Sequence, residues 1–147
     1  MSKSNIYNLK ELIDALKNKT VSYAQVLEKI NFKFKELEHL CFWDEESYSK
    51  ISLEKEDCFE LILICWERDQ YSQIHNHNNI EAWTYILKGE LTEEVYTANN
   101  TVIENSTILS QKNISCLTKQ SNKIHHLINS HNGRSVSLHL YVKEIKT

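Results

Sequence analysis

The apolar residues of this 147-residue chain change their spacing once, near residue 58. Before that point, two apolar stripes recur at the three- and four-residue spacing of one helix face. Asn8 stands where an N-cap is expected, and Ser22 with Gln25 resembles a capping box. The sequence therefore predicts two helices over about residues 8–38. The stripes consist of Leu9, Leu12, Ile13 and Leu16, and of Val26, Leu27, Ile30, Phe34 and Leu37.

After residue 58 the pattern is that of short strands separated by turn residues. Gly89 bends one segment into two strands, and Asn132-Gly133 is a strong hairpin signal. Two helices followed by six or more short antiparallel strands predict a mainly β fold, a β-barrel or jelly roll with a helical cap. The expected strand segments are Cys58–Trp66, Trp83–Tyr96, Thr101–Leu109, Ile114–Leu117, Ile124–Ile128 and Ser135–Ile145.

The composition restricts both the turns and the number of domains. Proline is absent and glycine occurs only at Gly89 and Gly133, whereas asparagine occurs 14 times. Because Asn tolerates left-handed backbone angles and hydrogen-bonds its own main chain, we expect Asn to form the turns. The length suits one domain over residues 1–147, with a helical cap at about 8–38 and a barrel at about 58–147.

Charge and hydropathy exclude several classes of function. The formal net charge is −3, which offers no attraction for nucleic acid or an anionic membrane. The longest apolar run, Leu61–Trp66, is far shorter than the roughly 20 residues of a membrane helix. The N-terminus has no apolar signal segment, and the four cysteines show no framework spacing. We therefore expect a cytoplasmic protein with reduced thiols.

The histidines suggest a metal site. His75 and His77 are separated by one residue, and in a strand both would point to the same side. Of the adjacent His125 and His126, only one can face the same cavity. Three imidazoles would suit iron, zinc, copper or nickel, so the ligand type alone does not identify the metal.

A polar face accompanies these histidines in the last expected strand. Alternation in Ser137-Leu138-His139-Leu140-Tyr141 places Ser137, His139 and Tyr141 on one face and the two leucines on the other. If that face is exposed to solvent, the strand is an ordinary edge strand. If it faces the barrel interior, the three groups must hydrogen-bond, because unsatisfied buried polar groups are costly.

An HxH pair, a glycine about a dozen residues later and a distant histidine resemble the pattern of the cupin barrel. Within the cupins, the sequence resembles the cysteine dioxygenase (thiol dioxygenase) family, of the bacterial type, from about Leu9 to Tyr141. The segments that carry this resemblance are Cys65-Trp66, Ser72-Gln73-Ile74-His75-Asn76-His77, Gly89-Glu90-Leu91 and Ser137-Leu138-His139-Leu140-Tyr141.

The resemblance implies a cupin β-barrel with two N-terminal helices and one Fe(II) per chain. His75 and His77 would be two ligands, and the family's third-ligand segment fits His125-His126-Leu127-Ile128-Asn129. His125 is then the third ligand, with His126 as the alternative. The family uses three neutral histidines because the substrate thiolate supplies the negative charge at the metal.

The resemblance also assigns Ser137, His139 and Tyr141 to a hydrogen-bonded chain behind the ligands, with the Tyr141 hydroxyl near the reacting oxygen and the substrate. The substrate-binding segment departs from the family. Tyr48 is retained, but Lys50 stands where the family carries an Arg that binds the substrate carboxylate. Lys is a compact point charge without the two-point fork of Arg, so another thiol acid such as 3-mercaptopropionate becomes a candidate beside cysteine.

Two further positions separate this chain from its relatives. Ala82 occupies the place of the Cys that some family members cross-link to the active-site Tyr, so that thioether cannot form here. Glu81 falls where a generic cupin would place a carboxylate ligand. Counting back from Gly89 in the register that the resemblance implies gives Ala82 the iron-facing position and puts Glu81 on the opposite side of the strand, so we do not expect Glu81 to bind the metal.

The sequence thus predicts an iron-dependent dioxygenase that oxidises a small thiol with O2, with L-cysteine as the leading substrate and cysteine sulfinate as the product. We expect a monomer or weak homo-oligomer with no nucleic-acid or membrane partner. The rival interpretations are a cupin of different chemistry that uses Glu81 as a ligand, and a non-catalytic cupin that binds a small molecule.

Overall fold

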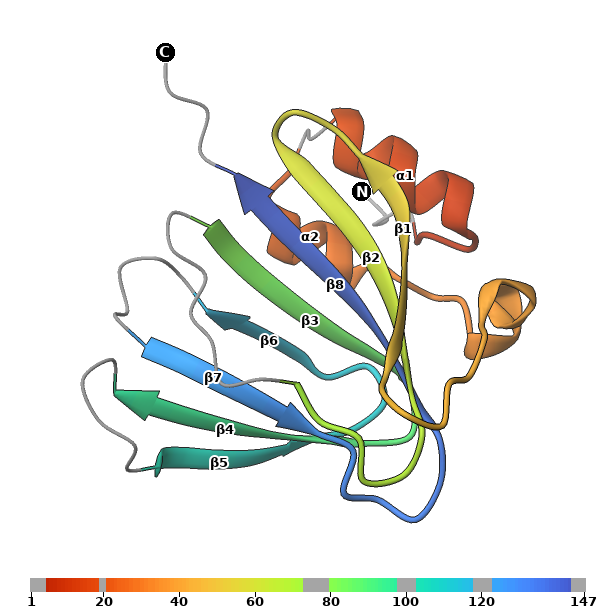
Figure 1. Cartoon of the computed structure of the whole chain (residues 1–147). Coiled ribbons are helices and arrows are strands. Elements are labelled where there is room, and N and C mark those ends of the chain that lie inside the picture. Colours follow the sequence, from red (N-terminus) through yellow and green to blue (C-terminus); the bar gives the residue numbers. More distant parts are fainter. Residues whose placement is uncertain (1–4, 19–20, 73–79, 98–102, 118–122, 144–147) are drawn as a thin grey trace. The chain divides into compact units, whose positions relative to one another are not determined.

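The computed structural model describes residues 5–18, 21–72, 80–97, 103–117 and 123–143. The chain divides into two compact units, Met1–Cys41 and Phe42–Thr147. Within the described ranges, the helices lie in the first unit and the strands of the two sheets in the second (Figure 1). No helix in these ranges is long and apolar enough to cross a membrane.

The first unit begins as its sequence predicts. Its elements are the helices α1 (Leu9–Asn18) and α2 (Tyr23–Glu28) and the short 3-10 helices η1 (Phe34–Glu36) and η2 (Glu38–Leu40). The Asn8 side chain accepts a hydrogen bond from the Glu11 N–H at 2.8 Å, as an N-cap does. Both hydrogen bonds of the capping box between Ser22 and Gln25 are present. The capping predictions are confirmed.

The second helix is much shorter than predicted. It ends at Glu28, although the apolar stripe continues to Leu37. The chain leaves the helix because Ile6 pairs with this segment instead: the Ile6 N–H donates to the Lys29 carbonyl at 2.8 Å, and the Ile6 carbonyl accepts from the Asn31 N–H at 2.7 Å. These long-range backbone bonds replace the bonds that a continued helix would make.

The second unit contains two antiparallel sheets. The five-stranded sheet has the order β1-β2-β8-β3-β6 and the three-stranded sheet the order β5-β4-β7. β1 was not among the predicted strands, whereas the other seven lie close to their predicted positions. The strands are β1 (Ser49–Lys55), β2 (Phe59–Trp66), β3 (Ile80–Lys88), β4 (Leu91–Thr97), β5 (Ile103–Leu109), β6 (Ile114–Leu117), β7 (Lys123–Ile128) and β8 (Ser135–Lys143).

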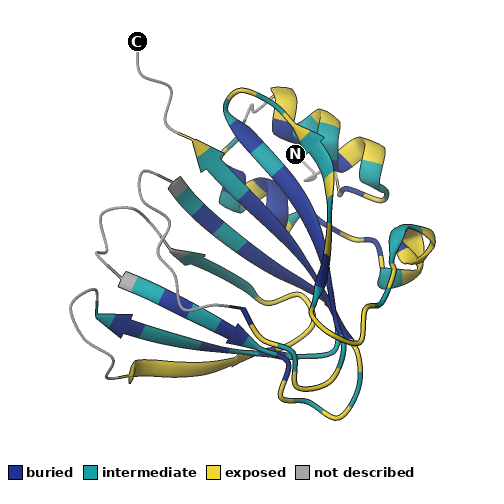
Figure 2. Ribbon diagram, viewed as in Figure 1, coloured by how far each residue is buried: buried dark blue, intermediate teal, exposed yellow. Residues whose placement is uncertain are grey.

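One apolar cluster joins the facing sides of the two sheets, and we call the space around it the interior. β2 and β8 are the most buried strands, whereas β5 is exposed along nearly its whole length (Figure 2). The cluster consists of Ile62, Ile64, Trp66 and Ile86 from the five-stranded sheet and Leu91, Leu109 and Leu127 from the other, with Tyr48 and Tyr141 packed against it. The predicted jelly-roll architecture is confirmed.

The turns differ from prediction in two respects. Asn132-Gly133 does not close a hairpin, because the strands on either side, β7 and β8, belong to different sheets. In the described ranges, the non-glycine residues with left-handed backbone are Asp69 (φ 70°) and Lys112 (φ 71°) rather than asparagines. Asparagine contributes through its side chain instead: Asn113 Oδ1 accepts a hydrogen bond from the Ser110 N–H at 2.8 Å.

Candidate functional site

The register of the five-stranded sheet places its polar residues in rows across the interior face. Residues directly opposite each other in antiparallel strands point to the same side of the sheet. One row pairs Ile62 with His139 and His139 with Thr84. Thr84 in turn pairs with Ser115 of β6. A second row runs Lys50–Ile64–Ser137–Ile86, and a third runs Glu60–Tyr141–Ala82.

Ser137 and His139 form a buried hydrogen-bonded chain on this face. The Trp66 indole Nε1–H donates to Ser137 Oγ at 2.9 Å, and Ser137 Oγ lies 2.7 Å from His139 Nε2. The other ring nitrogen, His139 Nδ1, lies 3.5 Å from Thr84 Oγ1. Trp66, Ser137 and His139 are all almost inaccessible to solvent. The face is therefore an interior one, and the edge-strand interpretation of Ser137, His139 and Tyr141 is wrong.

Tyr141 continues this face toward its outer end. Its ring centroid lies 6.3 Å from that of His139, and it packs against the apolar cluster. Burial, together with the neighbouring Tyr48 and Glu60 side chains, raises the pKa of the Tyr141 hydroxyl to about 12. The phenol therefore keeps its proton at neutral pH and can donate a hydrogen bond to a group in the interior.

The opposite sheet contributes a buried imidazole–carboxylate pair. His125 Nδ1 lies 3.1 Å from Glu93 Oε2, and the second carboxylate oxygen, Glu93 Oε1, accepts a hydrogen bond from Ser115 Oγ at 2.6 Å. Burial acts to raise the pKa of Glu93, but the hydrogen bonds from His125 and Ser115 outweigh it, and the pKa lies below its usual value. The pair therefore contains a carboxylate that accepts from the imidazole.

His126 and Glu81 lie on the other faces of their strands. In β7 the side chain of His126 points away from that of His125; it packs edge-on against Tyr71, with ring centroids 5.6 Å apart. Glu81 Oε1 accepts a hydrogen bond from the Trp83 Nε1–H at 2.6 Å, on the side of β3 opposite Ala82. The side chain of His125 thus lies on the interior side, whereas the other two candidate ligands, His126 and Glu81, point away from the interior.

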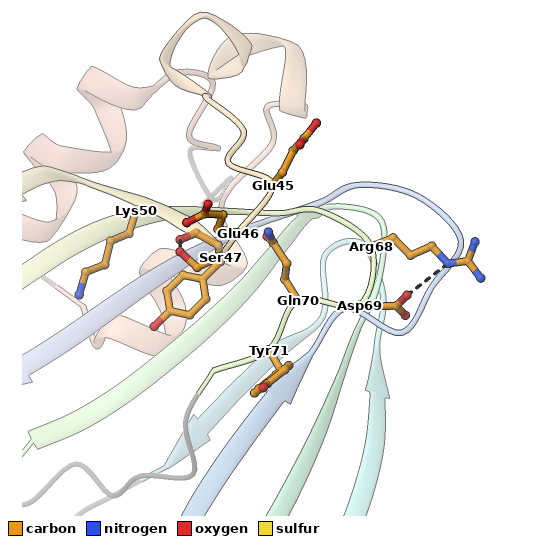
Figure 3. A pocket seen from close by; sticks show the side chains of 9 residues that line it. Glu45, Glu46, Ser47, Lys50, Arg68, Asp69, Gln70 and Tyr71 are labelled. Atoms are coloured by element: carbon orange, nitrogen blue, oxygen red, sulfur yellow. Dashed lines mark hydrogen bonds and ion pairs between the residues drawn. The ribbon is translucent and has the colours of Figure 1, made fainter.

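The residues of the predicted substrate-binding segment line one pocket of about 620 Å³. The Tyr48 ring stacks obliquely on Trp66, with centroids 4.8 Å apart, and Lys50 shares the row of Ser137. Figure 3 shows Lys50 at one end of the pocket and Arg68 at the other. Arg68 is paired with Asp69 at 3.8 Å, whereas Lys50 has no ion-pair partner in the part of the chain that the structure describes.

The loop before β1 is fixed by contacts with later segments. The Arg134 guanidinium stacks over the Trp43 ring at 4.3 Å and donates to Glu67 Oε1 at 2.8 Å. The Gln70 amide donates to the Asp44 carbonyl at 2.6 Å. These contacts hold the residues just before Tyr48 and Lys50 against the end of β2.

His75 and His77 lie outside the described residues, so the HxH pair is not placed. Among the residues that are described, no three His, Cys, Asp or Glu side chains form a group that could hold a metal. Of the three predicted ligands, the structure therefore places only His125. Its Nδ1 is engaged with Glu93, so Nε2 is the atom through which it would bind a metal. That arrangement is the usual one for a metal-binding histidine.

None of the four cysteines, all of which lie in the described ranges, forms a disulfide. Cys116 lies opposite Trp83 in the β3–β6 ladder. Burial, with the negative charges of Glu81 and Glu93 adding to it, raises the pKa of the Cys116 thiol to about 12. Because the thiolate is the reactive form, this thiol is chemically inert at neutral pH.

The two facing antiparallel sheets define the class of protein by its fold, which is that of a cupin. Protein TT1209 of Thermus thermophilus superposes with a TM-score of 0.63 at 18% identity, covering 73% of this chain and 93% of that protein. A cupin superfamily protein of Desulfitobacterium hafniense superposes with a TM-score of 0.59 at 17% identity, covering 74% of this chain and 88% of that protein. At such identities these structures establish the fold alone.

The chain belongs to the cysteine dioxygenase type I family, whose sequence profile matches residues 2–147. Human cysteine dioxygenase type 1 is 31% identical over 88 residues, which cover 56% of this chain and 44% of the human protein. The chain thus matches less than half of the length of this relative. The resemblance predicted from the sequence is confirmed.

Several residues at the site were not predicted from the sequence. These are Glu93 and Ser115, together with Trp66 and Thr84 as hydrogen-bonding residues. One signal was available for Glu93: alternation from Leu91 puts it on the same face as an apolar residue, where a carboxylate needs a partner. The contact with Ser115 had no local signal, because it joins strands of different sheets.

Proposed function

We propose that this chain is an Fe(II)-dependent thiol dioxygenase that adds both atoms of O2 to the sulfur of a small thiol. L-Cysteine is the leading substrate and cysteine sulfinate its product. Family membership supports the reaction class. The observation that carries the proposal is the buried Trp66–Ser137–His139 chain, which lies on the interior face with Tyr141 beyond it. A purely architectural cupin has no need of such a polar row inside its core.

The proposed ligands are His75, His77 and His125, holding one Fe(II) per chain. His125 fits this role by its interior position, its burial and the carboxylate on Nδ1. The assignment of His75 and His77 rests on the family resemblance. A bound ferrous ion would supply the redox chemistry with O2 and a position for the substrate thiolate.

The chain's own residues would bind and orient the substrate around that centre. Lys50 offers a positive charge to a substrate carboxylate, and Tyr48 lines the same pocket. Tyr141 keeps its phenolic proton and can donate it in a hydrogen bond to the reacting sulfur–oxygen group. The Ser137–His139 chain would fix the wall beside Tyr141, and Trp66 excludes water from it.

We further propose a cytoplasmic protein, because thiols persist in a reducing compartment. It would act on small molecules as a monomer or weak homo-oligomer.

The test is oxygen uptake by protein reconstituted with Fe(II) under anaerobic conditions. Cysteine, 3-mercaptopropionate, cysteamine and a thiol-free control are offered in turn, and the product is identified by mass spectrometry. We expect one O2 consumed per sulfinate formed. Failure to consume O2 with any thiol, in protein shown to contain iron, would exclude the thiol dioxygenase and favour another cupin chemistry or a binding function.

The same experiment tests a second candidate, a dioxygenase for 3-mercaptopropionate. It is a candidate because Lys50 stands where the family carries Arg: the ammonium can pair with the carboxylate that both acids share, but it does not reproduce the two parallel hydrogen bonds of Arg, so this contact does not single out cysteine. If 3-mercaptopropionate is oxidised with a higher kcat/KM than cysteine, it replaces cysteine as the substrate.

A further inference from the structure

Glu93 is a carboxylate in an unusual place. It is 6% exposed, and among the described residues it is the only Asp or Glu that is buried. It lies in the middle of β4, on the interior side with Leu91. A carboxylate in such a position is tolerated only when it is paired and hydrogen-bonded.

Both oxygens of Glu93 have partners, and the partners come from different sheets. Oε2 faces His125 Nδ1 on the neighbouring strand β7, and Oε1 accepts from Ser115 Oγ of β6 in the five-stranded sheet. A carboxylate only accepts hydrogen bonds, so the proton between Glu93 and His125 belongs to Nδ1. This fixes the tautomer in which Nε2 carries the lone pair.

We propose that Glu93 is the positioning residue of the metal ligand His125. Its carboxylate holds the imidazole in one orientation and one tautomer. It also brings a negative charge to a site whose three proposed ligands are neutral, without itself binding the metal. The inference rests on the proposed function, since it requires His125 to be a ligand.

The chain contains a matched control on the same two strands. Glu94 and His126 are the next residues along β4 and β7, and Glu94 Oε1 lies 3.4 Å from His126 Nδ1. This second pair points away from the interior. Changing Glu94 therefore removes the same charge from the same type of pair, one residue away, without reaching the proposed metal.

The test measures Fe(II) binding by anaerobic calorimetry in the metal-free protein and its variants. Carboxylates that orient metal-binding histidines typically contribute 10–100-fold in affinity. We expect Glu93→Gln, which keeps the size and one acceptor oxygen, to weaken Fe(II) binding by about 10–100-fold. Glu94→Gln should leave the dissociation constant unchanged within about twofold. Ser115→Ala, which removes one hydrogen bond from Glu93 and leaves the carboxylate, should have a smaller effect in the same direction.

The visible spectrum of the Co(II)-substituted protein gives a readout that a merely structural role would not change. Glu93→Gln should shift the ligand-field bands, whereas Glu94→Gln should not. Wild-type affinity in Glu93→Gln, with binding lost in His125→Ala, would overturn the role of Glu93 and leave the proposed ligand set standing. Wild-type affinity in His125→Ala would overturn the ligand set and the inference together.

Discussion

At the scale of single residues, the site depends on hydroxyl groups that serve two partners. Ser137 Oγ accepts a hydrogen bond from the Trp66 indole and bonds His139 Nε2, in a region from which solvent is excluded. Removing a hydroxyl there leaves two buried polar groups without their partner, and each unsatisfied group costs about 1–3 kcal/mol.

We therefore expect Ser137→Ala to lower the free energy of unfolding by about 2–4 kcal/mol. It should also reduce kcat, because the ring of His139 loses the bond that orients it. Urea denaturation and steady-state oxygen uptake measure the two effects. Ser52→Ala is the control: its hydroxyl bonds Glu60 on the same sheet, but at an exposed position, and it should change neither quantity appreciably. Equal stability of the two variants would contradict the importance of the buried chain.

Lys50 carries the residue-scale prediction for the substrate. Lys50→Arg restores the planar fork that the family uses, at a position that borders the pocket and carries no ion pair among the described residues. We expect the ratio of kcat/KM for cysteine over cysteamine, a thiol without a carboxylate, to rise by about tenfold, the equivalent of one charge-assisted hydrogen bond. Lys55→Arg, at the other end of β1, should leave the ratio unchanged. A ratio that does not move in Lys50→Arg would show that Lys50 does not select the substrate.

At the scale of elements, the features that depend on local sequence periodicity were predicted, whereas features that depend on contacts between distant segments were not. The capping residues and seven strands were predicted correctly. β1 was missed because Ser49–Lys55 is an edge strand whose side chains are largely exposed or half-buried, so it lacks the apolar pattern of a core strand. The end of α2 was misplaced because Ile6, far away in sequence, takes the backbone bonds of Lys29 and Asn31.

The connection between β3 and β4 requires a glycine, because a side chain at its corner would collide with neighbouring atoms. Gly89 joins β3 to β4, in different sheets, at φ +71°. A Cβ there would lie 2.5 Å from Ser135 Oγ and 2.7 Å from the Arg134 carbonyl. Ser135 cannot move easily, because its hydroxyl also bonds the Glu90 carbonyl and the buried Asn129 side chain.

Gly89→Ala should therefore destabilise the protein by about 2–4 kcal/mol, from left-handed backbone strain and overpacking together. The midpoint of urea denaturation gives the measurement. Lys112 is the natural comparison, because it has the same backbone conformation, φ 71°, at an exposed turn. Lys112→Gly should be neutral or stabilising by up to about 1 kcal/mol. If Gly89→Ala does not lower the stability to urea, the connection between β3 and β4 can accommodate a side chain, and the prediction is wrong.

At the scale of the whole molecule, the proposed metal would link segments that are far apart in the sequence. His125 belongs to β7, whereas His75 and His77 lie in sequence between β2 and β3, just after Tyr71 and Ser72, which pair with β7. The sheets already share an apolar cluster and the Glu93–Ser115 hydrogen bond. Of the candidate site, the sequence predicted the interior-facing His125 and missed Glu93 behind it, because the partners that allow a buried carboxylate there come from the separate strands β6 and β7.

Metal binding should therefore stabilise the folded chain, because the ligands come together only in the native state. At a free Fe(II) concentration of 100 times Kd, the expected gain is about 2.7 kcal/mol. For a chain of this size, that raises the melting temperature by roughly 5–10 °C. Anaerobic thermal denaturation with and without Fe(II) measures the shift.

The difference between metal-free and metal-loaded protein is compared within each variant, since His125→Ala also leaves the buried Glu93 carboxylate without its imidazole partner. His126→Ala should keep the full shift, because His126 points away from the interior, whereas His125→Ala should lose most of it. A shift that disappears in His126→Ala and persists in His125→Ala would transfer the ligand role to His126. It would also require β7 to present its other face to the metal, against the burial pattern of the strand.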